Sequence, residues 1–77
     1  MEPLDSQTQF RELEIRLRRD PNLQAVDFSG SFSTFYRWLE THRSDVLQQA
    51  EVLATDIRLW RDTQDVLQQL WKRIYQR

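Results

Sequence analysis

Glycine and proline, the residues that most often end helices, lie only in the first 30 residues of this chain. They are Pro3, Pro21 and Gly30, and residues 31–77 contain neither type. Because both residues are unfavourable in a helix interior, their absence allows helix throughout the rest of the chain. The distribution predicts an all-α fold with a short N-terminal helix, a connection over residues 20–31 and a long helical segment over residues 32–76.

An apolar residue recurs every seven positions along that segment. The series is Phe32, Leu39, Val46, Leu53, Trp60, Leu67 and Ile74. Such a repeat indicates a coiled-coil-like seam, although a long amphipathic helix of an ordinary bundle also repeats near seven. A second apolar stripe lies beside the first and contains Val52, Leu59, Val66 and Leu70. A helix that is apolar over so wide an arc packs against two neighbours, which favours a multi-helix bundle.

Two polar stretches, residues 41–45 and 61–65, offer N-cap side chains at which the segment can break. The apolar series crosses residues 62–65 in register, and we therefore expect a continuous helix there. Arg43 places a charge on the other row of the seam, which also contains Tyr36 and Ala50, and the second apolar stripe lapses there, so a kink or short turn is expected near residues 43–45. The pentapeptide DVLQQ occurs at residues 45–49 and 65–69. On one continuous helix the two copies would point about 200° apart, so only a break near Thr63 would make them matching helix starts.

The N-terminal part has its own helical pattern. Ser6 and Gln9 fit a capping box, and Phe10, Leu13 and Leu17 follow at helical spacing, which predicts a helix over residues 6–19. The alternation of apolar and charged residues over 13–18 also fits a strand, so a β hairpin over residues 11–28 is the alternative. The Asp20-Pro21 pair either forms the turn of that hairpin or caps a short helical turn.

The length of 77 residues indicates one small domain over residues 1–77. A domain of this size buries only about 60% of its unfolded surface, so its core is marginal. We therefore expect the helical hairpin or bundle to be completed by self-association, most simply as a dimer.

Composition argues against several classes of function. The chain has no cysteine, a single histidine and no glycine-rich phosphate loop, so we expect no cofactor, no metal, no small-molecule substrate and no enzyme activity. His42, Ser44 and Asp45 are the residue types of a catalytic triad, but on a helix Ser44 points away from the other two. The chain shows no signal-peptide pattern and no membrane-spanning run, so a cytoplasmic protein without membrane contact is expected.

The charges are balanced, with 11 basic and 12 acidic residues and a formal net charge of −1. Such a balance gives no long-range attraction to nucleic acid. A cluster of arginines on the first helix is the one feature that favours a nucleic-acid-binding regulator as the alternative function. Its members are Arg11, Arg16, Arg18 and Arg19.

Aromatic residues favour a different function. On a continuous helix Trp60 and Trp71 share one face, with Gln64 between them as a polar residue that can fix the register of a partner. Tryptophan, tyrosine and arginine dominate protein–protein hot spots. We therefore expect a small adaptor, regulator or assembly subunit that binds a protein partner through this face. The predicted partner-binding residues are Leu53, Ile57, Trp60, Arg61, Gln64, Leu67, Trp71 and Tyr75.

Overall fold

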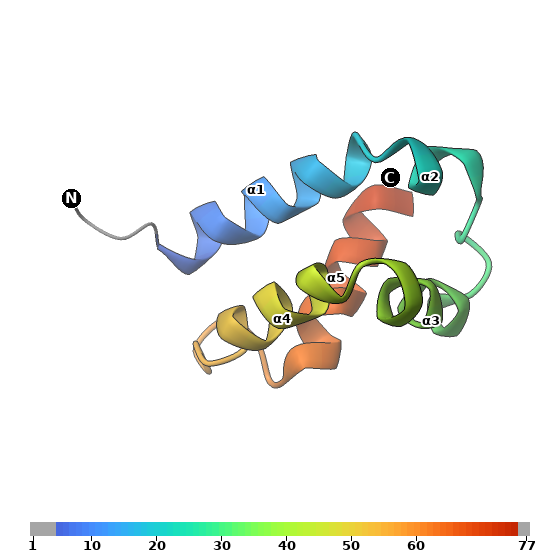
Figure 1. Ribbon diagram of the computed structural model, residues 1–77. Coiled ribbons are helices and arrows are strands. Elements are labelled where there is room, and N and C mark those ends of the chain that lie inside the picture. The colour runs from blue at the N-terminus through green and yellow to red at the C-terminus, as the bar shows by residue number, and fades with distance from the viewer. Residues whose placement is uncertain (1–4, 76–77) are drawn as a thin grey trace.

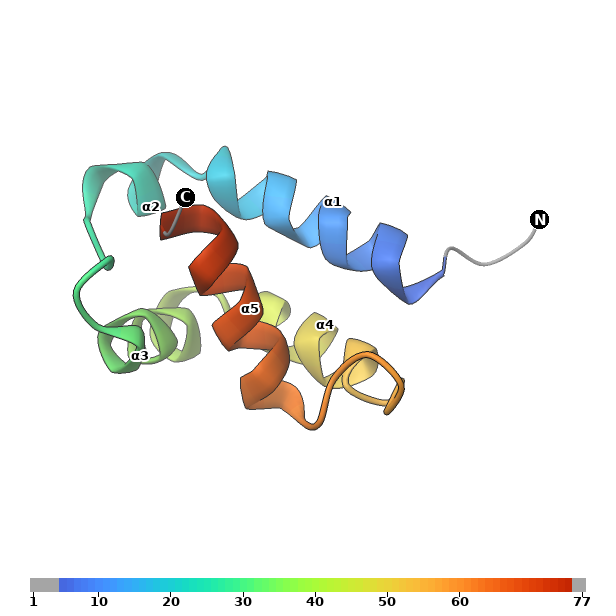
Figure 2. The ribbon, with the colours of Figure 1, turned by 180° about the vertical axis from the view of Figure 1, so that it is seen from behind.

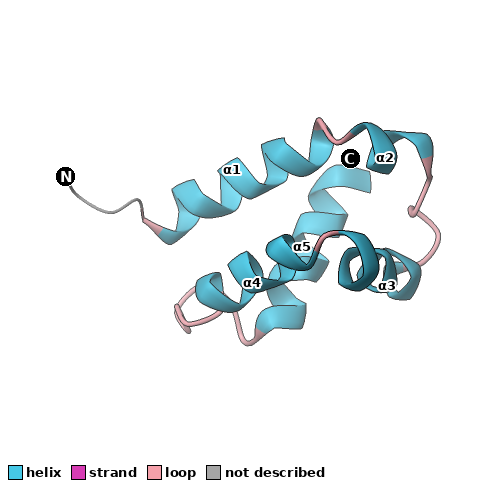
Figure 3. Cartoon of the chain, in the orientation of Figure 1, coloured by secondary structure: helices cyan, strands magenta, loops and turns pink. Residues whose placement is uncertain are grey.

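The computed structural model describes residues 5–75, which form five helices (Figures 1 and 3). They are α1 (Ser6–Arg18), α2 (Pro21–Ala25), α3 (Phe32–His42), α4 (Ser44–Leu53) and α5 (Thr63–Tyr75). No strand occurs among these residues, so the all-α prediction is confirmed and the β-hairpin alternative for residues 11–28 is wrong. No helix in this part of the chain is long and apolar enough to cross a bilayer.

Helices α4 and α5 pack against each other, and each of them contacts both α1 and α3. In Figure 1, α1 crosses above α4 and α5, and α2 and α3 lie at the far end from the start of α1. The reverse view in Figure 2 shows that the connection between α4 and α5 lies at the same end as the start of α1. The molecule therefore has a loop end and an α2–α3 end.

Polar side chains set the starts of the first two helices. Asp5 caps α1 by accepting a hydrogen bond from the Thr8 amide at 2.7 Å, so the cap lies one residue before the predicted Ser6. Asp20 caps α2 in the same manner, with Pro21 at the first helical position. The short-turn interpretation of the Asp20-Pro21 pair is therefore confirmed.

The predicted break near residues 43–45 is confirmed and is one residue long. Arg43 leaves the helical region, with φ −137° and ψ 59°, and its amide still donates to the Leu39 carbonyl at 2.8 Å. The chain enters α4 directly afterwards, at Ser44.

The predicted continuity from α4 into α5 is wrong. The first helix ends at Leu53, the second begins at Thr63, and residues 54–62 form a series of turns. The Asp62 carboxylate accepts a hydrogen bond from the Asp65 amide at 2.8 Å and so starts a new helix. The single long C-terminal helix does not exist.

The two copies of DVLQQ consequently become matching helix starts. Val46 and Val66 are both fully buried, and Ala50 and Leu70, four residues further on, are buried as well. Each copy therefore turns the same face of its helix toward the core.

The seven-residue series marks the core even though no single helix carries it. Five members of the series are buried and two, Phe32 and Ile74, are partly buried against the same cluster. Leu39, Val46 and Leu53 reach the core from α3 and α4, Trp60 from the loop and Leu67 from α5. One chain buries this core without a second copy, so the expected role of self-association in completing it is not confirmed.

Candidate protein-binding surface

The predicted partner-binding residues do not share a surface in the folded chain. Leu53, Trp60 and Leu67 are core residues, and Trp60 is only 4% exposed. Ile57 is 83% exposed on the loop of residues 54–62. Arg61 is exposed near the end of the same loop, and Gln64 is exposed in the first turn of α5 and therefore does not lie in a buried seam. The premise of one helix face fails because α4 and α5 are separate helices, and partner binding by these residues stays a prediction.

Trp71 and Tyr75 lie on a different side of α5, against α3. The Trp71 indole donates a hydrogen bond to the Phe28 carbonyl at 2.8 Å, and its ring lies 6.0 Å from that of Phe32. The Tyr75 ring meets Phe35 edge-on at 6.1 Å, and burial raises the pKa of its hydroxyl. Both side chains thus serve the α3–α5 contact.

Trp60 forms the base of a groove at the loop end. Its ring stacks on Phe10 with centroids 5.5 Å apart, and Leu59 extends the apolar wall. The groove has a volume of about 530 Å³, within the range of pockets that hold ligands or side chains. Its α5 wall is made by Gln69 and Arg73, on the face roughly 200° away from Trp71.

The rim of this groove is polar and contains two arginines. The Arg73 guanidinium lies 5.8 Å from the centre of the Phe10 ring and binds the buried Glu14 carboxylate. Glu14 also binds Arg18 of α1 at 3.0 Å. One carboxylate of α1 is therefore shared by an arginine of α1 and an arginine of α5, and it ties the two helices together. Arg11 lines the same groove, is exposed, and has no ion-pair partner among residues 5–75. It is therefore available to a carboxylate from outside.

The loop of residues 54–62 is held by its own hydrogen bonds. The Asp56 carbonyl accepts from the Leu59 and Trp60 amides, and the Thr55 hydroxyl donates to the Val52 carbonyl at 2.7 Å. The Asp56 carboxylate accepts from the Arg58 amide and guanidinium, which lowers the pKa of Asp56. The backbone around Ile57 is therefore ordered before any partner binds.

The end of the loop is fixed by a reciprocal cap. The Asp65 amide donates to the Asp62 carboxylate, and the Asp65 carboxylate in turn accepts from the Arg61 amide at 3.0 Å. With Trp60 buried on one side of this cap, residues 61–65 cannot shift without disturbing the core.

The arginine cluster on α1 is partly committed to the fold. Arg16 pairs with Asp45 at 3.3 Å, and Arg18 pairs with Glu14 and donates to the Arg73 carbonyl at 2.6 Å. Only Arg11 and Arg19 of the cluster have no ion pair within residues 5–75. The cluster therefore does not present four unopposed cations on one face, as phosphate binding would require.

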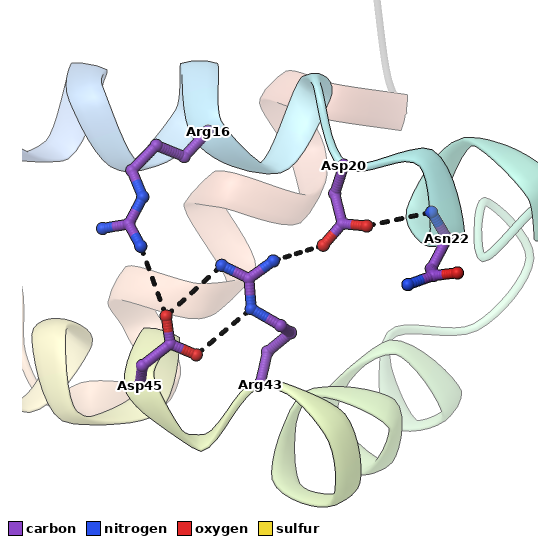
Figure 4. A network of polar contacts seen from close by, with 5 residues as sticks. All are labelled: Arg16, Asp20, Asn22, Arg43 and Asp45. Atoms are coloured by element: carbon purple, nitrogen blue, oxygen red, sulfur yellow. Dashed lines mark hydrogen bonds and ion pairs between the residues drawn. The ribbon is translucent and has the colours of Figure 1, made fainter.

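Arg43 is the centre of a second polar network, shown in Figure 4. Its guanidinium lies between the Asp45 carboxylate, 3.1 Å away, and the buried Asp20 carboxylate, which also accepts from the Asn22 amide. Hydrogen bonding from Arg43 holds the pKa of Asp45 below its usual value. The network ties the α3–α4 break to the α1–α2 junction.

The triad residue types of the sequence do not converge. Asp45 is bound to Arg43 and Arg16, and the His42 ring packs against Trp38 at 5.5 Å. Within residues 5–75 no group of three or more histidine, aspartate and glutamate side chains is placed to hold a metal ion.

No family model, curated protein or solved structure matches this chain.

The sequence did not reveal two parts of the groove, Phe10 as a stacking partner of Trp60 and Arg73 as its rim. Phe10 was visible as an apolar residue at helical spacing with Leu13, but nothing in the sequence indicates that α1 meets α5. The seven-residue series predicts that Trp60 lies on a helix, whereas Trp60 lies near the end of the loop of residues 54–62.

Proposed function

We propose that this chain is a small protein-interaction module, an adaptor or assembly subunit, that binds through its loop end. The loop-end surface consists of exposed Ile57 together with the groove formed by Phe10, Arg11, Leu59 and Trp60. The observation that carries the proposal is the 83% exposure of Ile57 on a loop fixed by hydrogen bonds. A large aliphatic side chain in water is favourable to bury, and a preformed loop loses little conformational entropy on binding.

The occupant that suits the groove is a protein segment with an aliphatic side chain followed by a carboxylate. Phe10, Leu59 and Trp60 supply the apolar wall, and Arg11 supplies at the rim a guanidinium that has no ion pair within residues 5–75. Arginine binds carboxylates through two parallel hydrogen bonds, which fixes the orientation of a bound segment. A segment of another protein and a second copy of this chain can both bring such groups.

Selection from a random peptide display library on the purified protein tests the proposal. We expect enrichment of peptides that combine aliphatic and acidic residues. Their affinity should fall at least tenfold for Arg11→Glu, because the substitution puts a repelling charge at the rim. The matched control is Arg19→Glu, at the C-cap of α1, which removes the other arginine of the cluster without an ion pair in residues 5–75 and should leave the affinity unchanged.

Two results would contradict the proposal. One is a library from which no binding peptide is enriched. The other is a set of peptides that bind Arg11→Glu and the parent protein equally well. Far-ultraviolet circular dichroism of both variants confirms that a loss of binding reflects the surface and not the fold.

A further inference from the structure

We infer that α1 is a lid: it opens as one unit while α3, α4 and α5 stay packed, and the loop-end groove exists only while α1 is closed. Figures 1 and 2 show α1 lying across α4 and α5 on one side of the molecule. Within residues 5–75, α1 packs against α2, α4 and α5 and makes no contact with α3. The effect of the lid on a bound peptide rests on the proposed function, whereas the opening of α1 rests on its contacts alone.

The interface of α1 differs in composition from the interfaces of the other long helices. The buried residues of α3, α4 and α5 are all apolar, and Phe35, Val46 and Leu70 among them are fully covered. The buried residues of α1 include Glu14, whose carboxylate binds Arg73 of α5. A buried charge stabilises a contact less than an apolar group does, because its desolvation offsets much of the ion pair. The docking of α1 is therefore the weakest of these helix contacts.

Ion pairs join α1 to both of its long neighbours. Glu14 binds Arg73 of α5, Arg16 binds Asp45 of α4 at 3.3 Å, and Arg18 donates to the Arg73 carbonyl at 2.6 Å. Three of these side chains, those of Arg16, Asp45 and Arg73, are more than half exposed. Pairs of exposed groups add little net stability, since water solvates the same groups when the helix leaves. The ion pairs thus position the closed lid without preventing it from opening.

The end of α1 next to α2 is fixed and serves as the hinge. Asp20, two residues after the last residue of α1, is buried, binds the Arg43 guanidinium and accepts from the Asn22 amide (Figure 4). Neither partner belongs to α1, so both contacts remain when α1 opens. The part of α1 farthest from the hinge, around Phe10, therefore moves most.

That part of α1 is one wall of the groove. Phe10 and Arg11 line the groove from α1, whereas Leu59, Trp60 and Arg73 line it from the loop and α5. Opening separates the two walls and parts the rings of Phe10 and Trp60, which lie 5.5 Å apart in the closed form. A ligand that touches both walls binds the closed form alone and shifts α1 toward it. Any change that favours opening therefore lowers the affinity of the groove.

Hydrogen exchange of the backbone amides of the full chain, followed by NMR at low urea concentrations, tests the lid. The Leu13 and Leu17 amides report on α1, and the Leu70 and Trp71 amides report on α5. An undocked helix of 13 residues is marginal in water, so α1 amides exchange whenever the lid opens. We expect them to exchange at least about tenfold faster than the α5 amides, which are exposed only by unfolding of the whole chain.

Two phenylalanine-to-leucine variants make the test specific to α1. Phe35→Leu weakens the contact of α3 with Tyr75 and should speed exchange of the α5 amides while leaving the α1 amides unchanged, because that contact survives the opening of α1. Phe10→Leu is the matched variant and weakens the docking of α1. It should speed both sets of amides by the same factor, since α1 is undocked in the open form and in the unfolded chain alike.

Equal exchange rates in the two helices would overturn the lid. A Phe35→Leu variant that speeds both sets of amides by the same factor would overturn it as well, because α1 would then open only when the whole chain unfolds.

A peptide selected on the parent protein in the display experiment tests the control of the groove by the lid. At saturation the peptide should slow exchange of the Leu13 and Leu17 amides in proportion to its concentration over its dissociation constant. A peptide that binds without slowing these amides would show that the groove does not need the closed lid. If no peptide binds, the proposed function fails, and the different responses of Phe35→Leu and Phe10→Leu still establish the opening of α1.

Discussion

The helical structure is interrupted at two joints, one before each copy of DVLQQ, and different interactions hold the two joints. At the first joint a single residue, Arg43, leaves the helix, and its guanidinium holds the turn through Asp20 and Asp45. At the second joint nine residues, 54–62, leave the helix, and backbone turns, a reciprocal cap and buried Trp60 hold them. The same pentapeptide therefore starts a helix after two different joints. Ion pairs hold the first joint, whereas backbone turns, a cap and the burial of a side chain hold the second.

The difference explains why the most exposed large apolar side chain of residues 5–75, Ile57, lies on the second joint. A one-residue joint has no room to carry side chains away from the core, and the side chain of Arg43 is itself partly covered. A nine-residue joint buries Trp60 at one end and leaves Ile57 in solvent. The longer joint is thus the one that can acquire a binding function.

Trp60→Ala is expected to have the largest effect, because it removes the side chain that fixes the second joint. Loss of a buried tryptophan and of its stacking on Phe10 should lower the free energy of unfolding by about 3–5 kcal/mol. Urea denaturation followed by circular dichroism measures the change. Ile57→Ala on the same loop is the control and should change the free energy by no more than about 0.5 kcal/mol. Equal losses in the two variants would contradict the assignment of Trp60 to the core.

Arg43→Met tests the first joint and is expected to have the second-largest effect. It leaves the buried Asp20 carboxylate without its ion pair, which should cost about 2 kcal/mol. Urea denaturation again measures the loss. Arg16→Met is the matched control, since its pair with Asp45 is exposed and should contribute less than about 1 kcal/mol. If the two variants lose the same amount, Arg43 is not the residue that holds the joint.

The sequence predicts local features of this fold well. The first helix, the short helix after Asp20 and the break at Arg43 each depend on neighbouring residues, namely a capping side chain, a proline or a charge on the seam. The seven-residue series predicted which side chains are buried, because the hydrophobic effect acts on each side chain whatever element carries it.

The sequence did not predict the second joint or the groove. An in-register series was interpreted as a continuous helix, but the turns of residues 54–62 return Trp60 to the core at the same seven-residue interval. The polar residues 61–65 offer an N-cap, but only the structure shows that Asp62 and Asp65 form one together. The pairs of Glu14 with Arg73 and of Phe10 with Trp60 join residues at least 50 positions apart, and no local pattern encodes such contacts.

Asp65→Ala tests the cap that closes the second joint and is expected to cost about 1 kcal/mol. It removes the acceptor of the Arg61 amide and one half of the reciprocal cap. Thermal unfolding followed by circular dichroism measures the loss. Glu51→Ala, an exposed residue of α4 outside any ion pair of residues 5–75, is the control and should be neutral. A neutral result for Asp65→Ala would mean that burial of Trp60 alone defines the end of the loop.

Low pH is expected to weaken both joints by a small amount, because an arginine at each joint stabilises a carboxylate in its charged form. Hydrogen bonds from Arg43 and Arg58 lower the pKa values of Asp45 and Asp56, respectively, below the usual 3.8. A carboxylate whose pKa is lower in the folded state stabilises the fold above its unfolded value, and that stabilisation is lost as the pH falls through the folded value. The free energy of unfolding should therefore be constant above about pH 5 and should decline below about pH 4.

The two arginines separate the contributions of the joints to this decline. Arg43→Met should flatten the decline that arises from Asp45, and Arg58→Met the part that arises from Asp56. Urea denaturation of both variants from pH 6 to about pH 2.5 gives the two slopes. Each carboxylate keeps another partner in these variants, Asp56 the Arg58 amide and Asp45 the Arg16 guanidinium, so each variant should reduce its part of the decline without abolishing it. An unchanged decline in Arg58→Met would mean that the loop backbone, and not the guanidinium, holds Asp56 in its charged form.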